Sequence, residues 1–540
     1  MAPRAWAGLL GPSLLCGCNA LVDTSTNQCD TALDCKSRGG ELAGMFCSAE
    51  KICTSTPLSC TTTGECTRRL GEPGYCRPDG ICTRVLSAEC TRVVPKGALS
   101  HSDVILAGFM GPLEPPFESQ GTPLLQAAEL AFEEMSKKRI PGVAAGPERH
   151  LAMLVCNDAP EDLNTLQRPF DVASYLVDTV GVPVIIGPSK VYADAIDVIT
   201  KVTSARGVLT ISPSASQADI PEMEQEGLFW RTVPSDAIQA DVWRPLSLMV
   251  VANFWKNDVL PETEEPHVRY VARADAYGTG LIESFRELVW KHAQVQPQGA
   301  SYSLQERPDW EALATEIVNA RPHALYAFST LEFVTELLPR IERFWGSAHP
   351  KPYYMLLDGT RVDALLAAVD ANPELGTRIL GSAPGLRTTP RFNGFRDRFR
   401  LSFDQEPGNL AEFAYDAAYL VAYAVASAKT QRPTGGELAG ALRNMSCPEG
   451  TAIEPGPDAF ATGLAAVTET SCVNYEGASG PLDFDSLTGE ARNDYSLWCP
   501  APDASGKTTF RELGKWYDNV SRHMSGFQED ELLQFCSATE

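Results

Sequence analysis

From residue 104 onward, short apolar segments alternate with longer amphipathic ones, and this alternation constrains the fold more than any other feature of the chain. The apolar segments are nearly continuous, which predicts strands that are covered on both faces. Such strands with helices between them are typical of parallel α/β sheets. The predicted strands are Val104–Gly108, Leu151–Val155, Val182–Gly187, Val208–Ser212, Val268–Ala272, Ala324–Ser329, Tyr353–Asp358 and Arg378–Ala383.

Apolar stripes at spacings of three and four predict helices between several of these strands. Thr122 followed by Pro123 predicts an N-cap and the first helical residue of one of them. Eight strand units over about 280 residues exceed one compact sheet, so we expect two lobes. Ligands of open α/β sheets bind at the carboxyl ends of the strands, which fits a cleft between the lobes. The stripes are Leu125, Ala128, Phe132 and Met135; Ile282, Phe285 and Val289; and Trp310, Leu313 and Ile317.

A four-cysteine pattern occurs twice near the start of the chain. Cys29-x5-Cys35-x11-Cys47-x5-Cys53 is followed, 31 residues later, by Cys60-x5-Cys66-x9-Cys76-x5-Cys82. Zinc ligands are usually closer together, so the five-residue gaps favour disulfides over a metal. Units of this size, 29–53 and 60–82, bury too little apolar surface to fold alone, and we expect cross-links to stabilise them within a cysteine-rich region at 29–90. The pairing inside each unit stays open. A rigid spacer is the simpler role, and a partner-binding module is the alternative.

The first residues predict export and lipid attachment. Arg4 precedes an apolar run, Ala5–Leu15, that is too short to span a bilayer. Leu15-Cys16-Gly17-Cys18 resembles the bacterial lipobox, which implies a signal peptide at 1–17, a lipid on Cys18 and a tether at 18–28. The alternative is an ordinary signal peptide that contains two cysteines. Asparagine, not aspartate, follows Cys18, which favours the outer membrane over the inner membrane of the cell envelope.

Composition and missing motifs argue against several functions. A formal net charge of −24 disfavours nucleic-acid binding, and 16 cysteines favour an oxidising compartment. Tyr415–Ala428, the longest later apolar segment, contains Asp416 and predicts a buried helix, not a membrane span. GxSxG, HExxH and GxxxxGK[ST] are absent and the histidines are scattered, so we expect no enzyme, no metal and no cofactor.

Six segments occur in an order that identifies a family resemblance. They are IIGPSK (Ile185–Lys190), VLTISPSAS (Val208–Ser216), FWRTVPSDAIQA (Phe229–Ala240), DAYGTGL (Asp275–Leu281), AYDAAYLVAYAVASA (Ala414–Ala428) and EGASGPLDFDSLTGEA (Glu476–Ala491). Together they resemble the type I periplasmic binding proteins, the branch that includes leucine/isoleucine/valine-binding proteins, over residues 103–498. The resemblance implies a two-lobed α/β fold with three crossovers, here preceded by the disulfide-rich repeats. The implied parts are a first lobe at 100–232 and 384–448, a second lobe at 233–383 and 481–498, and a C-terminal tail at 499–540.

The resemblance also implies candidate ligand contacts in both lobes. In the family the loop matching SPSAS holds the carboxylate and the amine of the ligand, and the loop matching IGPSK adds donors that are often consecutive serines. This chain lacks those serines, and Lys190 could instead suit a more anionic ligand. Turn, cap or packing roles are the structural alternatives for each candidate. The candidates are Ser189, Lys190, Tyr192, Ser214, Ala215, Ser216, Asp236, Tyr277 and Asp358.

The resemblance implies a protein that closes two lobes on a small polar solute, such as an amino acid, for delivery to an ABC-type permease. A ligand sensor and a structural envelope lipoprotein with a degenerate cleft are the alternatives. Six further cysteines lie outside the repeats, and proximity in sequence suggests three pairs: Cys90–Cys156, Cys447–Cys472 and Cys499–Cys536.

Overall fold

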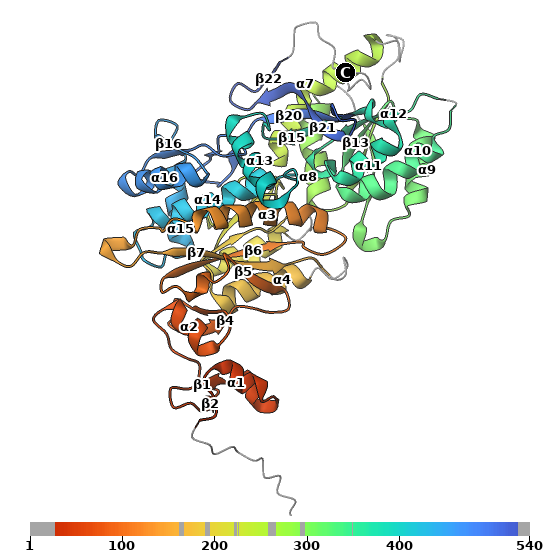
Figure 1. Ribbon diagram of the computed structural model, residues 1–540. Coiled ribbons are helices and arrows are strands. Elements are labelled where there is room, and N and C mark those ends of the chain that lie inside the picture. Colours follow the sequence, from red (N-terminus) through yellow and green to blue (C-terminus); the bar gives the residue numbers. More distant parts are fainter. Residues whose placement is uncertain are drawn as a thin grey trace, which may run out of the picture.

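The computed structural model describes residues 27–160, 167–189, 195–220, 224, 226–256, 266–291, 297–347 and 349–526. These residues form a narrow stalk at one end and two α/β lobes beyond it (Figure 1). The two-lobed fold and the disulfide-rich segment are therefore confirmed. The predicted signal peptide and the lipid site Cys18 lie outside the described residues. Within those residues, no helix combines the length and the apolar character that a membrane crossing needs.

The first lobe contains a six-stranded sheet in the order β10-β9-β8-β6-β7-β5. All neighbouring pairs are parallel except β5, which runs antiparallel to β7 at the edge. The four strands predicted for this lobe are confirmed, whereas β5 and β10 were not predicted. The bounds are β5 (Cys90–Val94), β6 (Val104–Gly111), β7 (His150–Asn157), β8 (Val184–Ile186), β9 (Leu209–Ser212) and β10 (Phe229–Arg231).

The second lobe contains an eight-stranded sheet in the order β12-β11-β13-β14-β15-β20-β21-β22. The first five strands are parallel and the last three are antiparallel. The predicted tail at 499–540 is corrected here, because β21 and β22 extend this sheet. The bounds are β11 (Val268–Arg273), β12 (Gln298–Tyr302), β13 (Ala324–Phe328), β14 (Tyr353–Leu356), β15 (Ile379–Pro384), β20 (Tyr495–Pro502), β21 (Thr508–Asp518) and β22 (His523–Ser525).

Helices cover both sheets, and the chain crosses between the lobes three times: after β10, after β15 and before β20. The first lobe has α3 (Glu118–Met135), α4 (Gln167–Ser174), α5 (Ala195–Val198), α13 (Pro390–Phe403), α14 (Ala411–Ser427) and α15 (Gly435–Leu442). The second lobe has α7 (Asp236–Lys256), α8 (Ala276–Phe285), α9 (Trp310–Ala320), α10 (Leu338–Phe344), α11 (Asp363–Ala371) and α12 (Pro373–Gly376).

Helix α3 begins earlier than predicted, at Glu118, so Pro123 lies inside the helix and Thr122 is not its N-cap. The early turn packs closely on the end of β6. A Cβ atom built on Gly121 would lie 1.9 Å from the carbonyl oxygen of Pro112, so only glycine allows this approach.

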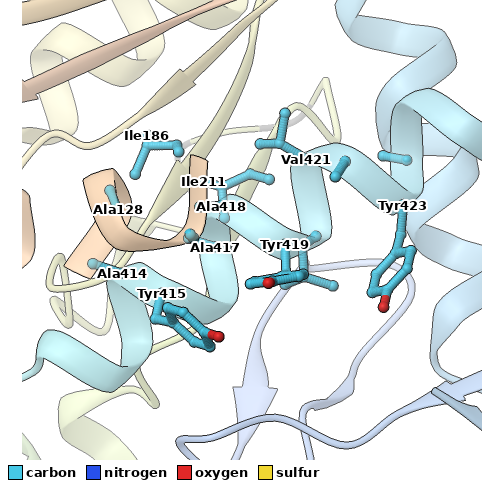
Figure 2. Packing of buried hydrophobic residues seen from close by; sticks show 14 of the residues in the cluster. Ala128, Ile186, Ile211, Ala414, Tyr415, Ala417, Ala418, Tyr419, Val421 and Tyr423 are labelled. Carbon is cyan, nitrogen blue, oxygen red and sulfur yellow. The ribbon is translucent and has the colours of Figure 1, made fainter. Parts of the chain in front are cut away.

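Helix α14 runs through the first lobe with its residues from 411 to 426 buried (Figure 2). Its alanines face α3 and the sheet, while Tyr415, Tyr419 and Tyr423 point to another side. Tyr415 and Tyr419 donate hydrogen bonds to the buried carboxylate of Glu134, at 2.5 and 2.9 Å. This packing confirms that Tyr415–Ala428 is a buried core segment.

Residues after α15 also belong to the first lobe. Strands β16 (Thr451–Ile453) and β17 (Val473–Tyr475), helix α16 (Pro457–Glu469) and the hairpin of β18 (Asp483–Phe484) and β19 (Ala491–Arg492) all contribute to its core cluster. The second lobe therefore resumes at β20, and not at residue 481 as predicted.

Among the predicted cysteine pairs outside the repeats, the Cys447–Cys472 disulfide is absent from the structure. Both residues carry free, partly exposed thiols, so that prediction was wrong. The two thiols lie side by side, and a hydrogen bond with Cys472 raises the pKa of Cys447. Cys499 is disulfide-bonded, while its predicted partner Cys536 lies outside the described residues.

The stalk consists of the two cysteine units. In each unit the first cysteine bonds the third and the second bonds the fourth: Cys29–Cys47, Cys35–Cys53, Cys60–Cys76 and Cys66–Cys82. The sulfurs of a unit lie close enough together for a metal, but disulfides occupy them, as expected. The first unit has α1 (Ala32–Ser37), β1 (Phe46–Cys47) and β2 (Cys53–Thr54); the second has α2 (Thr63–Leu70), β3 (Gly74–Cys76) and β4 (Cys82–Arg84).

The second unit is docked on the first lobe, which limits the predicted role as a separate spacer. Arg77 donates hydrogen bonds to the carbonyls of Asp178 and Thr179, both at 2.9 Å. Arg432 reaches back from the lobe to the carbonyl of Thr61, also at 2.9 Å. The predicted Cys90–Cys156 disulfide is confirmed and joins β5 to β7, so Cys90 belongs to the lobe sheet.

Candidate functional site

A cavity of about 870 Å³ lies between the two lobes. Its walls come from three places: the start of α3 and the β8 and β9 loops of the first lobe, the segment that leads into α14, and the edge of the second lobe formed after β14 and by β21. Residues that line it include Ser119, Thr122, Ser189, Ser214, Gly359, Arg361, Arg387, Asn409, Thr508, Phe510 and Glu512. Beside the cavity the lobes touch directly, because the side chain of Asn409 donates to the carbonyl of Asp358 at 2.9 Å.

Ser189 and Ser214 bring two hydroxyls together on the first-lobe wall. They follow β8 and β9, two neighbouring parallel strands, and their oxygens lie 3.5 Å apart. Ser212 shapes the second loop by accepting hydrogen bonds from the backbone N–H groups of Ser214 and Ala215, at 3.3 and 2.8 Å. The N–H of Ala215 is therefore used within the loop, which gives Ala215 a structural role.

Tyr277 approaches the same region from the second lobe. It follows Asp275, which caps α8 by accepting from the N–H of Gly278 at 3.0 Å and pairs with Arg273 at 2.5 Å. The Tyr277 hydroxyl lies so near Gly359 that a Cβ atom built there would be 2.9 Å from it. Tyr277 therefore packs directly behind a residue of the cavity wall.

Two carboxylates complete the buried group around Tyr277. Asp236 begins α7, and its backbone N–H donates to the carbonyl of Ser216 at 2.8 Å. Asp358 begins a 3-10 turn, Asp358–Thr360, at the end of β14. Burial first, and then the charges of Asp358 and Asp236, raise the pKa of Tyr277 well above its usual value. The tyrosine is thus a neutral hydroxyl beside two acids.

The structure separates the sequence candidates into three groups. Ser189 and Ser214 line the cavity. Ala215, Ser216, Asp236, Tyr277 and Asp358 are buried next to these walls without lining it. Lys190 and Tyr192 lie outside the described residues, so their contacts stay a prediction.

Two arginines of the cavity wall were missed from the sequence. Arg387, after the β15 crossover, pairs with Glu412 through both carboxylate oxygens at 2.9 Å. Arg361 lies three residues after Asp358, in the same loop. The rule that ligands meet the carboxyl ends of strands applies to Arg361 as well as to Asp358, so that rule could have found it.

The comparisons with known proteins agree with this architecture. The family model described as "Periplasmic binding protein" matches residues 105–497. Among curated proteins, none matches the sequence significantly. The chain belongs to the periplasmic binding protein family, which implies export from the cytoplasm and a fold built to bind solutes.

Solved structures show the same fold at low sequence identity. The leucine-binding protein LivK of Thermotoga maritima is 16% identical with a TM-score of 0.55, over 75% of this chain and 97% of that one. LivJ of Streptococcus pneumoniae, in complex with isoleucine, is 18% identical with a TM-score of 0.52, over 76% and 99%. A solute-binding protein of Rhodopseudomonas palustris, in complex with 3,4-dihydroxybenzoic acid, is 15% identical with a TM-score of 0.58, over 77% and 98%.

Proposed function

We propose that this chain is a membrane-anchored solute-binding protein that closes its two lobes on a small polar ligand, an amino acid or a related compound, for uptake by an ABC-type permease. The observation that carries the proposal is the cavity of about 870 Å³ with walls from both lobes. A cavity of this size suits a small molecule, and few convergent polar groups suffice to orient one. Ser189 and Ser214 are such groups, and they support a ligand that accepts hydrogen bonds.

The relatives support the same class of ligand without identifying it. LivJ was solved with isoleucine and the Rhodopseudomonas protein with an aromatic acid. Both ligands are small molecules that carry a carboxylate, so a panel of such solutes is the starting point for this chain.

Thermal unfolding of the oxidised full chain, carrying Cys18→Ser to prevent lipid attachment, tests the proposal. A solute that binds only the folded state, present at a hundred times its dissociation constant, raises the free energy of unfolding by about 2.7 kcal/mol. We expect one class of solutes to raise the unfolding temperature. Ser214→Ala should weaken the affinity for those solutes about fivefold, because one hydrogen bond is lost. Ser301→Ala, at an exposed position of β12, is the matched control. If no solute shifts the unfolding of folded protein, the proposal fails and a structural envelope role takes its place.

The anchor is tested separately from the ligand. Expressed in a Gram-negative host, the unchanged chain should partition into detergent with the membrane fraction, whereas Cys18→Ser should stay in the aqueous phase. Equal partitioning of the two would argue against a lipid on Cys18.

A further inference from the structure

The side chain of Arg361 lies in the wall of the cavity and is almost completely buried. It belongs to the second lobe, directly after the 3-10 turn Asp358–Thr360, and is only 6% exposed. Its guanidinium rests against two aromatic rings, 6.0 Å from the centre of Trp498 and 5.3 Å from that of Phe510. These rings fix the position of the charge at the cavity surface by cation–π contact.

Among the described residues, the guanidinium of Arg361 has neither a hydrogen-bond acceptor nor an ion-pair partner, and its Nε is buried. The other buried arginines of the described residues each have a carboxylate or carbonyl partner, although several of them also have an Nε without one. Arg378 pairs with Glu342 at 2.8 Å, and Arg149 donates to the carbonyls of Pro141 and Thr430 at 2.7 and 3.2 Å. Because a buried charge without a partner is costly, Arg361 is the exception that calls for a missing anion.

The neighbouring acids do not supply that anion. Glu412 is taken up by Arg387 through both of its oxygens. Glu512 accepts the backbone N–H of Arg387 at 3.3 Å, and burial raises its own pKa. Burial, reinforced by the charge of Arg387, lowers the pKa of Arg361 to about 9, although the charges of Glu512, Glu412 and Asp358 act in the opposite direction. A bound anion would reverse this penalty.

We propose that Arg361 binds a carboxylate group of the solute that enters the cavity. This inference rests on the proposed function and names its ligand class: small organic acids bound through the second lobe. A planar carboxylate matches the two-pronged donor edge of a guanidinium, and charged hydrogen bonds of this kind are the strong ones. Ser189 and Ser214 line the same cavity from the first lobe and would contact the rest of the ligand. Contact with both walls would hold the lobes together.

The experiment compares acids with their own amides by calorimetry on the oxidised full chain carrying Cys18→Ser. The pairs are leucine and leucinamide, benzoate and benzamide, and succinate and succinamide. We expect at least one acid to bind about 30-fold more tightly than its amide, because the amide lacks the charge that Arg361 needs. Arg361→Gln should remove that preference and leave amide binding unchanged, and Arg361→Lys should keep part of it.

Arg396→Gln is the matched control, because Arg396 lines the same cavity but already pairs with Asp397 at 3.2 Å. It should change acid binding less than threefold. Arg361→Gln removes an unpaired buried charge, so its unfolding temperature should not fall. The comparison of acids with amides uses the unchanged binding site, so its result remains valid even if a variant folds poorly.

Three other outcomes would contradict the inference, and they distinguish its failure from that of the proposed function. If a solute binds but acid and amide bind equally, or if Arg361→Gln acts no differently from Arg396→Gln, the inference is wrong while the proposed function stands. If inorganic phosphate binds through Arg361 and no carboxylate does, the assignment of a carboxylate is wrong. If no solute binds to folded protein, the proposed function fails and this inference fails with it.

Discussion

In the stalk, cysteines make up most of the small buried clusters, whereas in the first lobe the buried cluster is large and contains the alanines, tyrosines and leucines of α14 and its neighbours. The two regions pack against each other through the second cysteine unit. They differ in what opposes unfolding. Covalent links that limit the unfolded chain act in the stalk, and exclusion of water from a large apolar cluster acts in the lobe. The two regions should therefore fail under different conditions.

Reduction should produce the largest effect and should separate the two regions. Each stalk disulfide joins cysteines 16 or 18 positions apart, and closing a loop of that length contributes about 3 kcal/mol. Losing two such links should unfold a unit that has so small a core. Hydrogen exchange with and without dithiothreitol should show lost protection at residues 29–82 and retained protection in β6 and α14. Protection of the stalk after full reduction would refute the comparison.

A substitution that leaves a void in the core of the first lobe should destabilise the lobe and leave the stalk unchanged. Leu420 of α14 is fully buried, so Leu420→Ala should lower the free energy of unfolding of the first lobe by about 2–5 kcal/mol. Leu401→Ala, on α13, is the matched control, because Leu401 is 88% exposed and should change stability by less than about 0.5 kcal/mol. Chemical denaturation measures both. Exchange protection of the first stalk unit should be the same in the two variants; a parallel loss there would show that the regions unfold together.

The smallest effect concerns pH and the first lobe. Asp416 of α14 is completely buried and accepts hydrogen bonds from Tyr475, Ala478 and Ser479, which tie the loop before β18 to the core. Burial raises the pKa of Asp416 to about 6 even though these hydrogen bonds lower it. In the unfolded chain the pKa is about 3.9.

Because the folded value is the higher one, this group stabilises the lobe fully below about pH 4, and that contribution is lost as the pH rises to about 6 and beyond. The total change is at most about 3 kcal/mol, from 1.36 kcal/mol for each pKa unit. Denaturation of the unchanged chain and of Asp416→Asn between pH 4 and 8 isolates it as the difference between the two curves. A difference that is flat with pH would mean that Asp416 is ionised throughout.

How far the sequence predicts this molecule depends on the burial of each segment. The eight strands predicted from apolar runs are present because a strand covered on both faces must be apolar throughout. Strand β12 was missed since it lies at a sheet edge and reads Gln-Gly-Ala-Ser-Tyr. Strand β21 mixes polar and apolar residues on an antiparallel ladder, so its segment was mistaken for a tail.

The site was predictable only in part for a related reason. Ser189 and Ser214 follow predicted strands and line the cavity, while ligand contact at either residue stays a prediction. Arg361 has the same position relative to β14, but a basic residue in a loop usually lies in water. Only the packing of Trp498 and Phe510, from strands more than 130 positions away in the chain, shows that it is buried.

Whatever holds the stalk also holds the first lobe, because the second cysteine unit and the Cys90–Cys156 link fasten them into one body. The second lobe lies at the far end of the molecule (Figure 1) and is joined to that body by three crossovers. When the cavity opens or closes, the first lobe therefore stays fixed with the stalk, and the second lobe moves relative to it. A partner protein that distinguishes the ligand-bound state from the empty state must recognise the position of the second lobe relative to the first.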